Sequence, residues 1–315
     1  MRILLTGITG QVGWELQRTL MILGEVIPVG RSASNTALYM DLAHPDTIRR
    51  VCREVKPDLI VNAAAYTAVD KAEQESELAM TINGIAPGVM AEEAKLLGAA
   101  IIHYSTDYVF DGTKNIPYTE QDKPDPQNTY GKTKLAGEQA IQSVGVPHLI
   151  LRTSWVYGLR GKNFLLTMLK LAREREELSV VDDQIGAPTW SRMIAEATAQ
   201  ILAQGTQSLA ILASQSGMYH LSATGQTSWY GFARAIFDHN SHSELKMQKL
   251  MPLTSDQYPT AARRPAYSLL DSRRLCDTFG LALPNWQTTL ELVLDSKTAS
   301  VSSALSFSAL LSNSK

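Results

Sequence analysis

The first twenty residues constrain the fold more than any other stretch. An apolar run at 2–6 leads into a glycine-rich turn, and a helix-favouring segment follows at 14–20. The turn consists of Gly7, Gly10, Gln11, Val12 and Gly13, together with the residues between them. Strand, glycine turn and helix in this order can bind a pyrophosphate, because glycines allow close approach of the backbone and the helix N-terminus offers free N–H groups. A second apolar run at 25–30 favours a nucleotide site over a merely tight turn.

Apolar and helical segments alternate from this turn as far as residue 152. Short apolar runs bounded by turn signals, the pattern of buried parallel strands, lie at 59–62, 99–105 and 149–152. The helical segments include 73–97 and one that begins near Asn128. This alternation predicts an α/β fold with a doubly wound parallel sheet and right-handed crossovers, the Rossmann architecture.

The pattern changes after residue 155. Shorter helices and strands predict a smaller α/β portion that is interleaved with the sheet rather than joined to it by a linker. We expect residues 1–155 to form mainly the dinucleotide-binding domain and residues 156–295 mainly the substrate-binding portion. The Ser-rich end at 296–315 is compatible with a frayed helix or a disordered tail.

The residue after the second strand selects between the two nicotinamide dinucleotides. Sites that prefer NAD place an Asp or Glu there for the ribose 2′-hydroxyl, whereas an Arg suits a 2′-phosphate. This chain has Arg31 at that place. We therefore expect NADPH, with NADH as the alternative, although a single exposed Arg is more often an ordinary surface charge.

Ligands of open α/β sheets bind at the carboxyl ends of the strands. Asp41 closes a short apolar segment and either meets an adenine amino group or caps the helix that follows. The strand at 59–62 ends in three alanines, whose small side chains leave room for a flat ligand. Besides the glycine turn and Arg31, the expected cofactor-binding residues are Asp41, Leu42, Ala63, Ala64, Ala65, Tyr104, Tyr130 and Lys134.

Tyr130 and Lys134 lie four residues apart in a segment that we expect to be helical, so they share one face of the helix. A phenol with a reference pKa of about 10 is a poor acid–base catalyst at neutral pH, but a nearby ammonium lowers its pKa. Thr106, at a strand end, can supply a second hydrogen bond to the same carbonyl oxygen. Tyr and Lys also occur at this spacing by chance in many helices, so the context decides.

Composition is that of a globular enzyme. The chain has 315 residues, of which 44% are hydrophobic and 19% are charged, enough for a large core. No run approaches about eighteen consecutive apolar residues and Met1 leads directly into the first strand, so we expect no membrane span, no signal peptide and a cytoplasmic location. A net charge of −2 argues against a nucleic-acid partner. Cys52 and Cys276 are too few for a disulfide framework, and we expect both to be reduced.

Several motifs together resemble the extended short-chain dehydrogenase/reductase superfamily. They are the glycine turn, Asn62-Ala63-Ala64-Ala65, Ser105-Thr106-Asp107-Tyr108-Val109-Phe110 and the Tyr130-x-x-x-Lys134 pair. Within that superfamily, longer motifs are similar to those of the dTDP-4-dehydrorhamnose reductases. These motifs span Ala64 to Glu73, Tyr130 to Glu138, Arg152 to Tyr157 and Asp183 to Thr189. The resemblance runs from Met1 to about Leu294.

The resemblance implies NADPH-dependent reduction of the C4 ketone of dTDP-4-dehydro-L-rhamnose to dTDP-L-rhamnose, in deoxysugar supply for cell-surface polysaccharide. In such enzymes the Tyr, here Tyr130, protonates the C4 oxygen as the hydride arrives. Lys134 corresponds to the residue that holds the nicotinamide ribose and lowers the tyrosine pKa, and Thr106 to the one that hydrogen-bonds the same oxygen. The resemblance also implies a nucleotide-sugar partner and a homodimer. Some relatives are associated with Mg²⁺, but no ligand spacing for that ion is recognisable here.

The expected substrate-binding residues include three with an explicit structural alternative. Trp155 can cover the apolar face of a deoxyhexose or pack in the core. Asn163 can contact the diphosphate or cap a helix, and Arg264 can line the dTDP site or be solvated surface. The remaining expected substrate contacts are Thr67, Asp107 and Tyr108. The adjacent acids Asp182 and Asp183 are typical of a solvated turn, so we expect no metal there.

Two other functions remain open. A 4,6-dehydratase or epimerase would reuse the cofactor and the Tyr130–Lys134 pair, but dehydratases similar to this chain carry a Glu where Tyr108 follows Asp107. A non-catalytic NADP-binding regulatory subunit would share the fold. The intact Thr106, Tyr130 and Lys134 argue against that second alternative.

Overall fold

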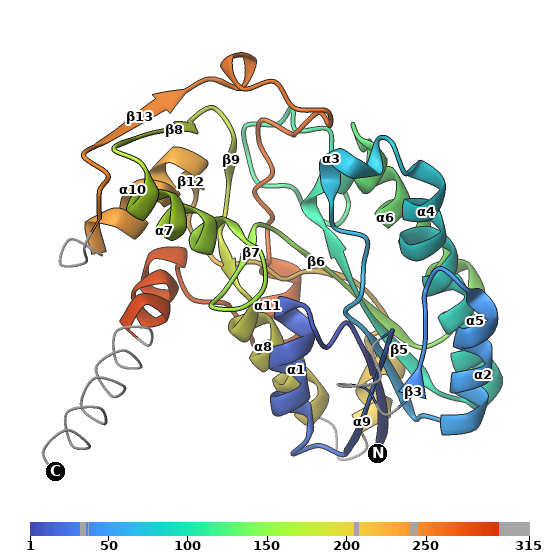
Figure 1. The fold of residues 1–315 in the computed structure, drawn as a ribbon. Coiled ribbons are helices and arrows are strands. Elements are labelled where there is room, and N and C mark those ends of the chain that lie inside the picture. The colour runs from blue at the N-terminus through green and yellow to red at the C-terminus, as the bar shows by residue number, and fades with distance from the viewer. Residues whose placement is uncertain (32–35, 37, 205–207, 240–244, 296–315) are drawn as a thin grey trace, which may run out of the picture.

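A seven-stranded parallel sheet lies at the centre of the computed structural model, which describes residues 1–31, 36, 38–204, 208–239 and 245–295 (Figure 1). The strand order is β11-β6-β5-β4-β1-β2-β3. The strands are β1 (Arg2–Thr6), β2 (Glu25–Gly30), β3 (Leu38–Tyr39), β4 (Leu59–Asn62), β5 (Ala100–Thr106), β6 (His148–Thr153) and β11 (Gly217–His220). The order reverses between β1 and β4, which creates the crevice at which such sheets bind ligands. The predicted doubly wound parallel sheet is confirmed.

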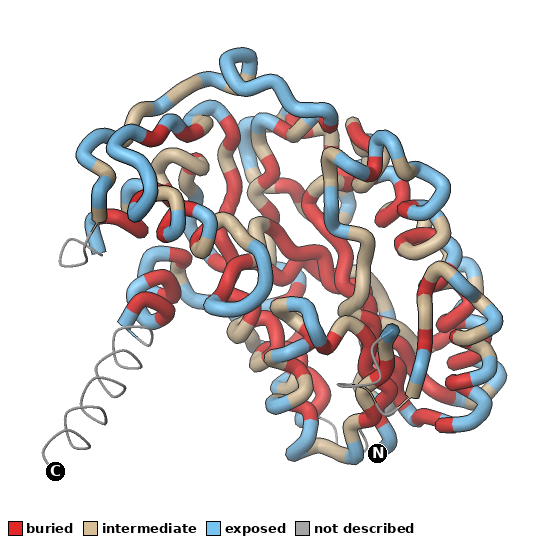
Figure 2. The backbone as a smooth tube through the Cα atoms, viewed as in Figure 1, coloured by how far each residue is buried: buried red, intermediate tan, exposed pale blue. Residues whose placement is uncertain are grey.

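Helices cover both faces of the sheet (Figure 1). One face carries α1 (Gln11–Leu20), α8 (Ser191–Ala203), α9 (Ser208–Ser214) and α11 (Arg273–Phe279). The other face carries α2 (Pro45–Val55), α5 (Ala86–Leu97) and α6 (Thr129–Val144). Figure 2 shows the buried residues concentrated along the strands. Burial on both faces explains why the strands appear in the sequence as continuous apolar runs.

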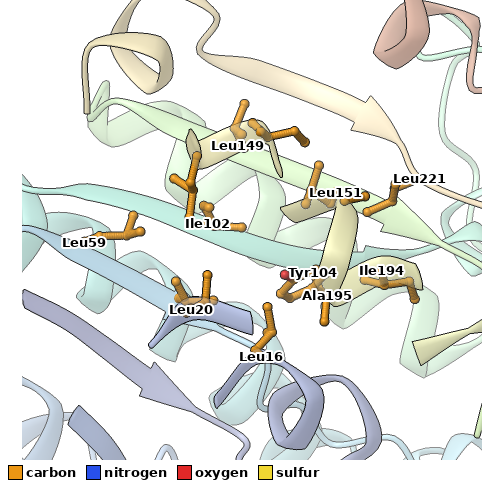
Figure 3. Close-up of a cluster of buried hydrophobic side chains, with 14 of the residues drawn as sticks. Leu16, Leu20, Leu59, Ile102, Tyr104, Leu149, Leu151, Ile194, Ala195 and Leu221 are labelled. Atoms are coloured by element: carbon orange, nitrogen blue, oxygen red, sulfur yellow. The ribbon is translucent and has the colours of Figure 1, made fainter. Parts of the chain in front are cut away.

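The period of two along each strand divides the apolar residues between the two layers. Leu4 of β1 packs in the layer of α2, α5 and α6, whereas its neighbours Ile3 and Leu5 pack in the layer of α1 and α8. Figure 3 shows part of the layer of α1 and α8, where Leu16 and Leu20 of α1 belong to the same cluster as Leu59 and Ile102 of the sheet.

The segment at 73–97, expected to be one helix, is divided. It contains α4 (Ser76–Met80), a π-helical turn η1 (Thr81–Ile85) and α5, and a short α3 (Val69–Ala72) precedes them. The side chain of Asn83 in η1 accepts a hydrogen bond from Tyr66 N at 2.8 Å and donates to Tyr66 O at 3.0 Å. Asn83 therefore holds the segment that follows β4 against the π-helical turn, a feature common near functional sites.

A smaller portion with its own core follows β6. It contains α7 (Phe164–Glu174), β8 (Glu177–Val181), α10 (Trp229–His239), β13 (Lys249–Leu253) and a helix over 286–295. Short pairs join β7 (Val156–Tyr157) to β10 (Thr189–Trp190) and β9 (Ile185–Gly186) to β12 (Thr227–Ser228). Single 3₁₀ turns lie at η2 (Asp107–Val109) and η3 (Ser255–Gln257).

The chain returns to the large sheet after this portion has begun, since α8, α9, β11 and α11 all pack on or join it. The predicted interleaving is thereby confirmed. The boundary near residue 155 stays a prediction, and the expected tail at 296–315 lies outside the described residues.

Candidate functional site

The glycine turn folds tightly between β1 and α1. Gly7 has a φ of +73°, and a Cβ there would lie 2.5 Å from the backbone of Ala63. A Cβ on Gly13 would lie 2.2 Å from Gly7 O, so neither position can accept a side chain without displacing backbone. Gly10 precedes α1 and contributes no side-chain cap. The N–H groups of the first turn therefore have no side-chain partner from the N-cap and are suited to bind an anion.

A cavity of about 600 Å³ opens at the carboxyl ends of the sheet strands. It brings together nearly all the predicted cofactor residues, namely Gly7, Gly10, Gln11, Val12, Arg31, Asp41, Leu42, Ala63, Ala64, Ala65, Tyr104, Tyr130 and Lys134. Thr67, predicted as a substrate contact, also lines it. Gly13 does not, because it packs beneath the turn. Thr6, Ser105, Thr153 and Lys162 line the cavity without having been predicted.

Asp41 had two interpretations, and the structure decides against the helix cap. The N-cap of α2 is His44, and the Asp41 carboxylate instead accepts a hydrogen bond from Ala43 N at 3.0 Å. Its side chain lines the cavity. Contact with a cofactor stays a prediction.

Tyr130 stands in the first turn of α6, where Asn128 caps the helix by accepting from Gly131 N at 2.8 Å. The ring is partly accessible from the cavity, yet desolvation by the surrounding protein raises the pKa of Tyr130 to about 12. A hydrogen bond with Thr106 acts in the opposite direction, and the charge of Asp107 raises the pKa further. The expected lowering of this pKa by Lys134 is wrong for this structure, in which burial dominates.

Lys134 is buried one helical turn further on, with 2% of its surface exposed. Its Nζ donates to Tyr104 O at 2.6 Å and lies 3.1 Å from His103 Nε2. Burial lowers the pKa of Lys134 to about 8, and the charge of Glu138 opposes that effect. The Lys134 Nζ contacts are therefore to residues of β5, and Lys134 is not among the groups that shift the pKa of Tyr130.

Thr106 ends β5 and is also buried. Its hydroxyl donates to Asp107 Oδ1 at 3.0 Å and accepts from Tyr108 N at 3.1 Å. Burial raises the pKa of Asp107 to about 6. The structure therefore brings Thr106 to Tyr130, as predicted, but places the Asp107 carboxylate against Thr106 in the interior rather than on the cavity wall.

Tyr108 lies next to Tyr130 and Arg264 next to Tyr108, and neither residue lines the cavity. The Tyr108 ring meets the Tyr130 ring edge-on, with 5.7 Å between centroids. Arg264 forms a two-point pair with Asp70 at 3.1 and 2.6 Å, and it hydrogen-bonds the Tyr108 side chain. The guanidinium is therefore already balanced by a carboxylate, and its contact with a substrate phosphate stays a prediction.

The helix cap, the structural alternative for Asn163, is present, whereas Trp155 is partly exposed and stacks on another Trp rather than packing in a core cluster. Trp155 stacks on Trp229 with 3.5 Å between ring centroids and 4° between planes. Asn163 is the N-cap of α7, accepts from Leu166 N at 3.1 Å and donates to Gln11 Oε1 at 2.9 Å. Neither observation tests a substrate contact, but the bond to Gln11 joins the smaller portion to the glycine turn.

No group of three or more His, Cys, Asp or Glu in the described ranges could hold a metal ion. Asp182 accepts from the Ser228 hydroxyl, whereas Asp183 accepts from Ser255 Oγ at 2.7 Å, so the two acids serve different segments. Nothing in the described site supports the Mg²⁺ that some relatives are associated with. In the same ranges, no helix combines the length and the apolar composition needed to cross a bilayer.

The chain matches the family model of the RmlD substrate binding domain over residues 1–299. It is 48% identical over 296 residues to the dTDP-4-dehydrorhamnose reductase of Burkholderia thailandensis, covering 93% of this chain and 97% of the relative. The chain belongs to the dTDP-4-dehydrorhamnose reductase family. The family resemblance expected from the motifs is thereby confirmed.

Solved structures of the family agree with this assignment. The dTDP-4-dehydrorhamnose reductase of Bacillus anthracis, in complex with NADP, superposes with a TM-score of 0.84 at 36% identity, over 94% of this chain and 99% of that one. The UDP-glucose 4-epimerase of Thermus thermophilus, in complex with NAD, gives a TM-score of 0.76 at 18% identity, over 94% and 98% of the two chains. The epimerase supports the fold alone.

Proposed function

We propose that this member of the dTDP-4-dehydrorhamnose reductase family uses NADPH to reduce the C4 ketone of dTDP-4-dehydro-L-rhamnose, giving dTDP-L-rhamnose. The observation that carries the proposal is one cavity lined by the glycine turn, Arg31, Tyr130 and Lys134, with Thr106 in contact with Tyr130. Relatives of this chain are named for that reaction, and the Bacillus anthracis relative is in complex with NADP.

The cavity walls fit a nicotinamide dinucleotide. Ser105 Oγ and Thr153 Oγ1 are buried, belong to residues that line the cavity, and have no hydrogen-bond partner within the described chain. Buried hydroxyls without a partner are costly, so they favour a polar ligand. The N-terminus of α1 would hold the pyrophosphate and Arg31 the 2′-phosphate. When bound, the reduced nicotinamide supplies the hydride.

The residues of the chain supply and control the proton. Tyr130 remains protonated at neutral pH because its pKa is raised, and it donates this proton to the C4 oxygen. Thr106 orients the Tyr130 hydroxyl. When the Thr106 hydroxyl turns away from Asp107, it can donate a hydrogen bond to the same C4 oxygen of the sugar. Lys134 as an ammonium stabilises the negative charge that remains on Tyr130. We assign the cofactor mainly to residues 1–155 and the sugar mainly to 156–295.

The test is the loss of NADPH absorbance with purified protein and dTDP-4-dehydro-L-rhamnose, with NADH in parallel and the product identified by NMR. NADPH consumption with formation of dTDP-L-rhamnose supports the proposal. An epimerase or dehydratase would change the sugar without net NADPH consumption, and a binding subunit would change neither.

A further inference from the structure

A chain of hydrogen bonds runs through the interior of the sheet and connects two points of the cavity wall. It begins at Lys134 Nζ, which lies 3.1 Å from His103 Nε2. His103 Nδ1 lies 3.0 Å from Asn62 Nδ2, and Asn62 Oδ1 accepts from Thr6 Oγ1 at 2.7 Å. Thr6 Oγ1 in turn accepts from Ala64 N at 3.1 Å. His103 and Asn62 are each 1% exposed, so water does not replace these bonds.

The direction of this chain depends on the tautomer of His103. When the Asn62 amide donates to Nδ1, that nitrogen is an acceptor, and the single N–H of a neutral imidazole is on Nε2. That N–H then points at Lys134 Nζ, which must accept it with a lone pair. This arrangement therefore suits Lys134 as a neutral amine.

The reverse arrangement suits Lys134 as an ammonium. The ammonium donates to Nε2, so the ring proton is on Nδ1 and needs an acceptor. A half-turn of the Asn62 amide provides one, with Oδ1 towards the ring and Nδ2 towards Thr6 Oγ1. The half-turn removes the long bond from Ala64 N to Asn62 Oδ1 at 3.3 Å, and Ala64 N keeps its bond to Thr6 Oγ1. The Thr6 hydroxyl then accepts from Asn62 and Ala64 N and turns its proton to the cavity, which Thr6 lines.

We propose that His103 is a positioning residue that holds Lys134 in place and stabilises its ammonium form through the chain to Asn62 and Thr6. The proposal deepens the proposed function, on which it rests, because the Lys134 ammonium is the group that stabilises the deprotonated Tyr130. A bond from an ammonium to an imidazole nitrogen is about twice as strong as one between neutral groups. The loss of His103 therefore weakens the ammonium form more than the amine form.

The electrostatic surroundings of Lys134 are compatible with both forms near neutral pH. Burial lowers the pKa of Lys134 to about 8 and keeps the pKa of His103 well below its usual range, so the imidazole is neutral. The titratable and charged groups that act on Lys134 are His103 on β5 and Glu138 on α6, and Glu138 is paired with Arg152 of β6. Tyr130 lies one turn earlier on α6 with Asp107 acting on it, and the Tyr104 phenol is bonded to Thr198 instead.

Two variants of the full chain shift the protonation of Lys134 in opposite directions. His103→Phe removes the acceptor from the ammonium, so the protonation equilibrium of Lys134 moves towards the amine by roughly tenfold. Asn62→Asp keeps the shape of the side chain and the acceptor for Thr6 Oγ1 and Ala64 N, which in the wild type donate to Asn62 Oδ1 at 2.7 and 3.3 Å. Its second carboxylate oxygen accepts from the ring and so fixes the ring proton on Nδ1. It therefore moves the equilibrium towards the ammonium by a similar factor.

The measurement is NMR titration of the protein labelled with ¹³C-lysine, with the Lys134 signal assigned by its absence in Lys134→Met. His220→Phe is the matched control, because it replaces a buried His on β11 by the same apolar ring. The proposal is supported if the pH midpoint of the Lys134 titration shifts in opposite directions in His103→Phe and Asn62→Asp and does not shift in His220→Phe. Equal titration of Lys134 in the wild type and Asn62→Asp overturns it, even if His103→Phe does not fold.

Activity provides a second readout. Because the mechanism needs the Lys134 ammonium, kcat falls at high pH as Lys134 loses its proton. The pH at which kcat falls is therefore lower in His103→Phe and higher in Asn62→Asp. If His103 has only a structural role, His103→Phe lowers the stability of the protein but leaves the pH at which kcat falls unchanged. The NMR titration needs no turnover, so a wild-type protein without reductase activity contradicts the proposed function and leaves the test of His103 intact.

Discussion

The hydroxyl of Thr106 donates to the carboxylate of Asp107 across 3.0 Å, so the residue beside the proposed acid Tyr130 is itself held by a buried acid. The hydrogen bond from Thr106 lowers the pKa of Tyr130, which requires the Thr106 proton to turn from Asp107 towards the Tyr130 oxygen. Asp107 orients Thr106 from within the protein, and its expected contact with the substrate stays a prediction.

Asp107→Asn should stabilise the protein at pH 8 but not at pH 4. Burial raises the Asp107 pKa from 3.8 to about 6, so the native state disfavours the ionised form. The resulting loss of unfolding free energy in the wild type is absent below pH 4 and grows as the pH rises to 6. Above pH 6 it stays constant at roughly 3 kcal/mol. Urea unfolding of both proteins across this range measures it. A difference in unfolding free energy that does not change with pH would refute the assigned ionisation.

Tyr130→Phe should lower kcat by about 10²- to 10⁴-fold and leave NADPH affinity nearly unchanged, because proton donation belongs to the transition state. Steady-state kinetics and a fluorescence titration with NADPH measure the two quantities. Tyr219→Phe is the matched control, since it removes a Tyr hydroxyl that donates to Gln215 O and does not line the cavity. Turnover of Tyr130→Phe near the wild-type rate would remove Tyr130 as the acid.

Arg31→Ala should raise the KM for NADPH by about tenfold or more, because a charge-assisted bond to a phosphate is lost. The KM for NADH should not change, since NADH has no 2′-phosphate. Arg175→Ala replaces an exposed Arg that does not line the cavity and controls for loss of surface charge. If both cofactors lose affinity equally, Arg31 does not discriminate between them.

Glu138→Gln should destabilise the protein by about 3–5 kcal/mol, because Arg152 would be left buried with an unbalanced charge. The pair has two bonds, at 2.9 and 2.7 Å, and both side chains are almost fully buried. Glu196→Gln breaks an exposed pair with Arg192 on α8 and should cost less than about 1 kcal/mol. Denaturant unfolding of the two variants compares them directly, and equal losses would contradict the account.

The sheet could be predicted because its strands are buried on both faces and appear as continuous apolar runs between glycine and alanine turns. The edge of the sheet that carries the predicted cofactor residues was also predictable, because residues that follow parallel strands meet at one edge. The π-helical turn at Thr81–Ile85 was not, because its sequence is compatible with an ordinary helix and its Asn83 contacts depend on the distant Tyr66.

The electrostatics of the site could not be derived from spacing. A spacing of four positions places Tyr130 and Lys134 on one helix face. The Lys134 pKa, however, depends on burial, and the Lys134 hydrogen bonds depend on Tyr104 O and His103. Thr6 and Asn62 come from different strands and meet only when β1 and β4 pair. Their polar character at strand ends was visible in the sequence, whereas their connection to Lys134 was not.

The most direct test of the central claim is a reaction with NADPH that carries deuterium at the transferable C4 position of the nicotinamide, followed by NMR of the sugar product. The account predicts dTDP-L-rhamnose with one deuterium at C4 of the sugar, formed in equal amount to the NADPH consumed. Deuterium elsewhere in the sugar, or a changed sugar with no NADPH consumed, would contradict it.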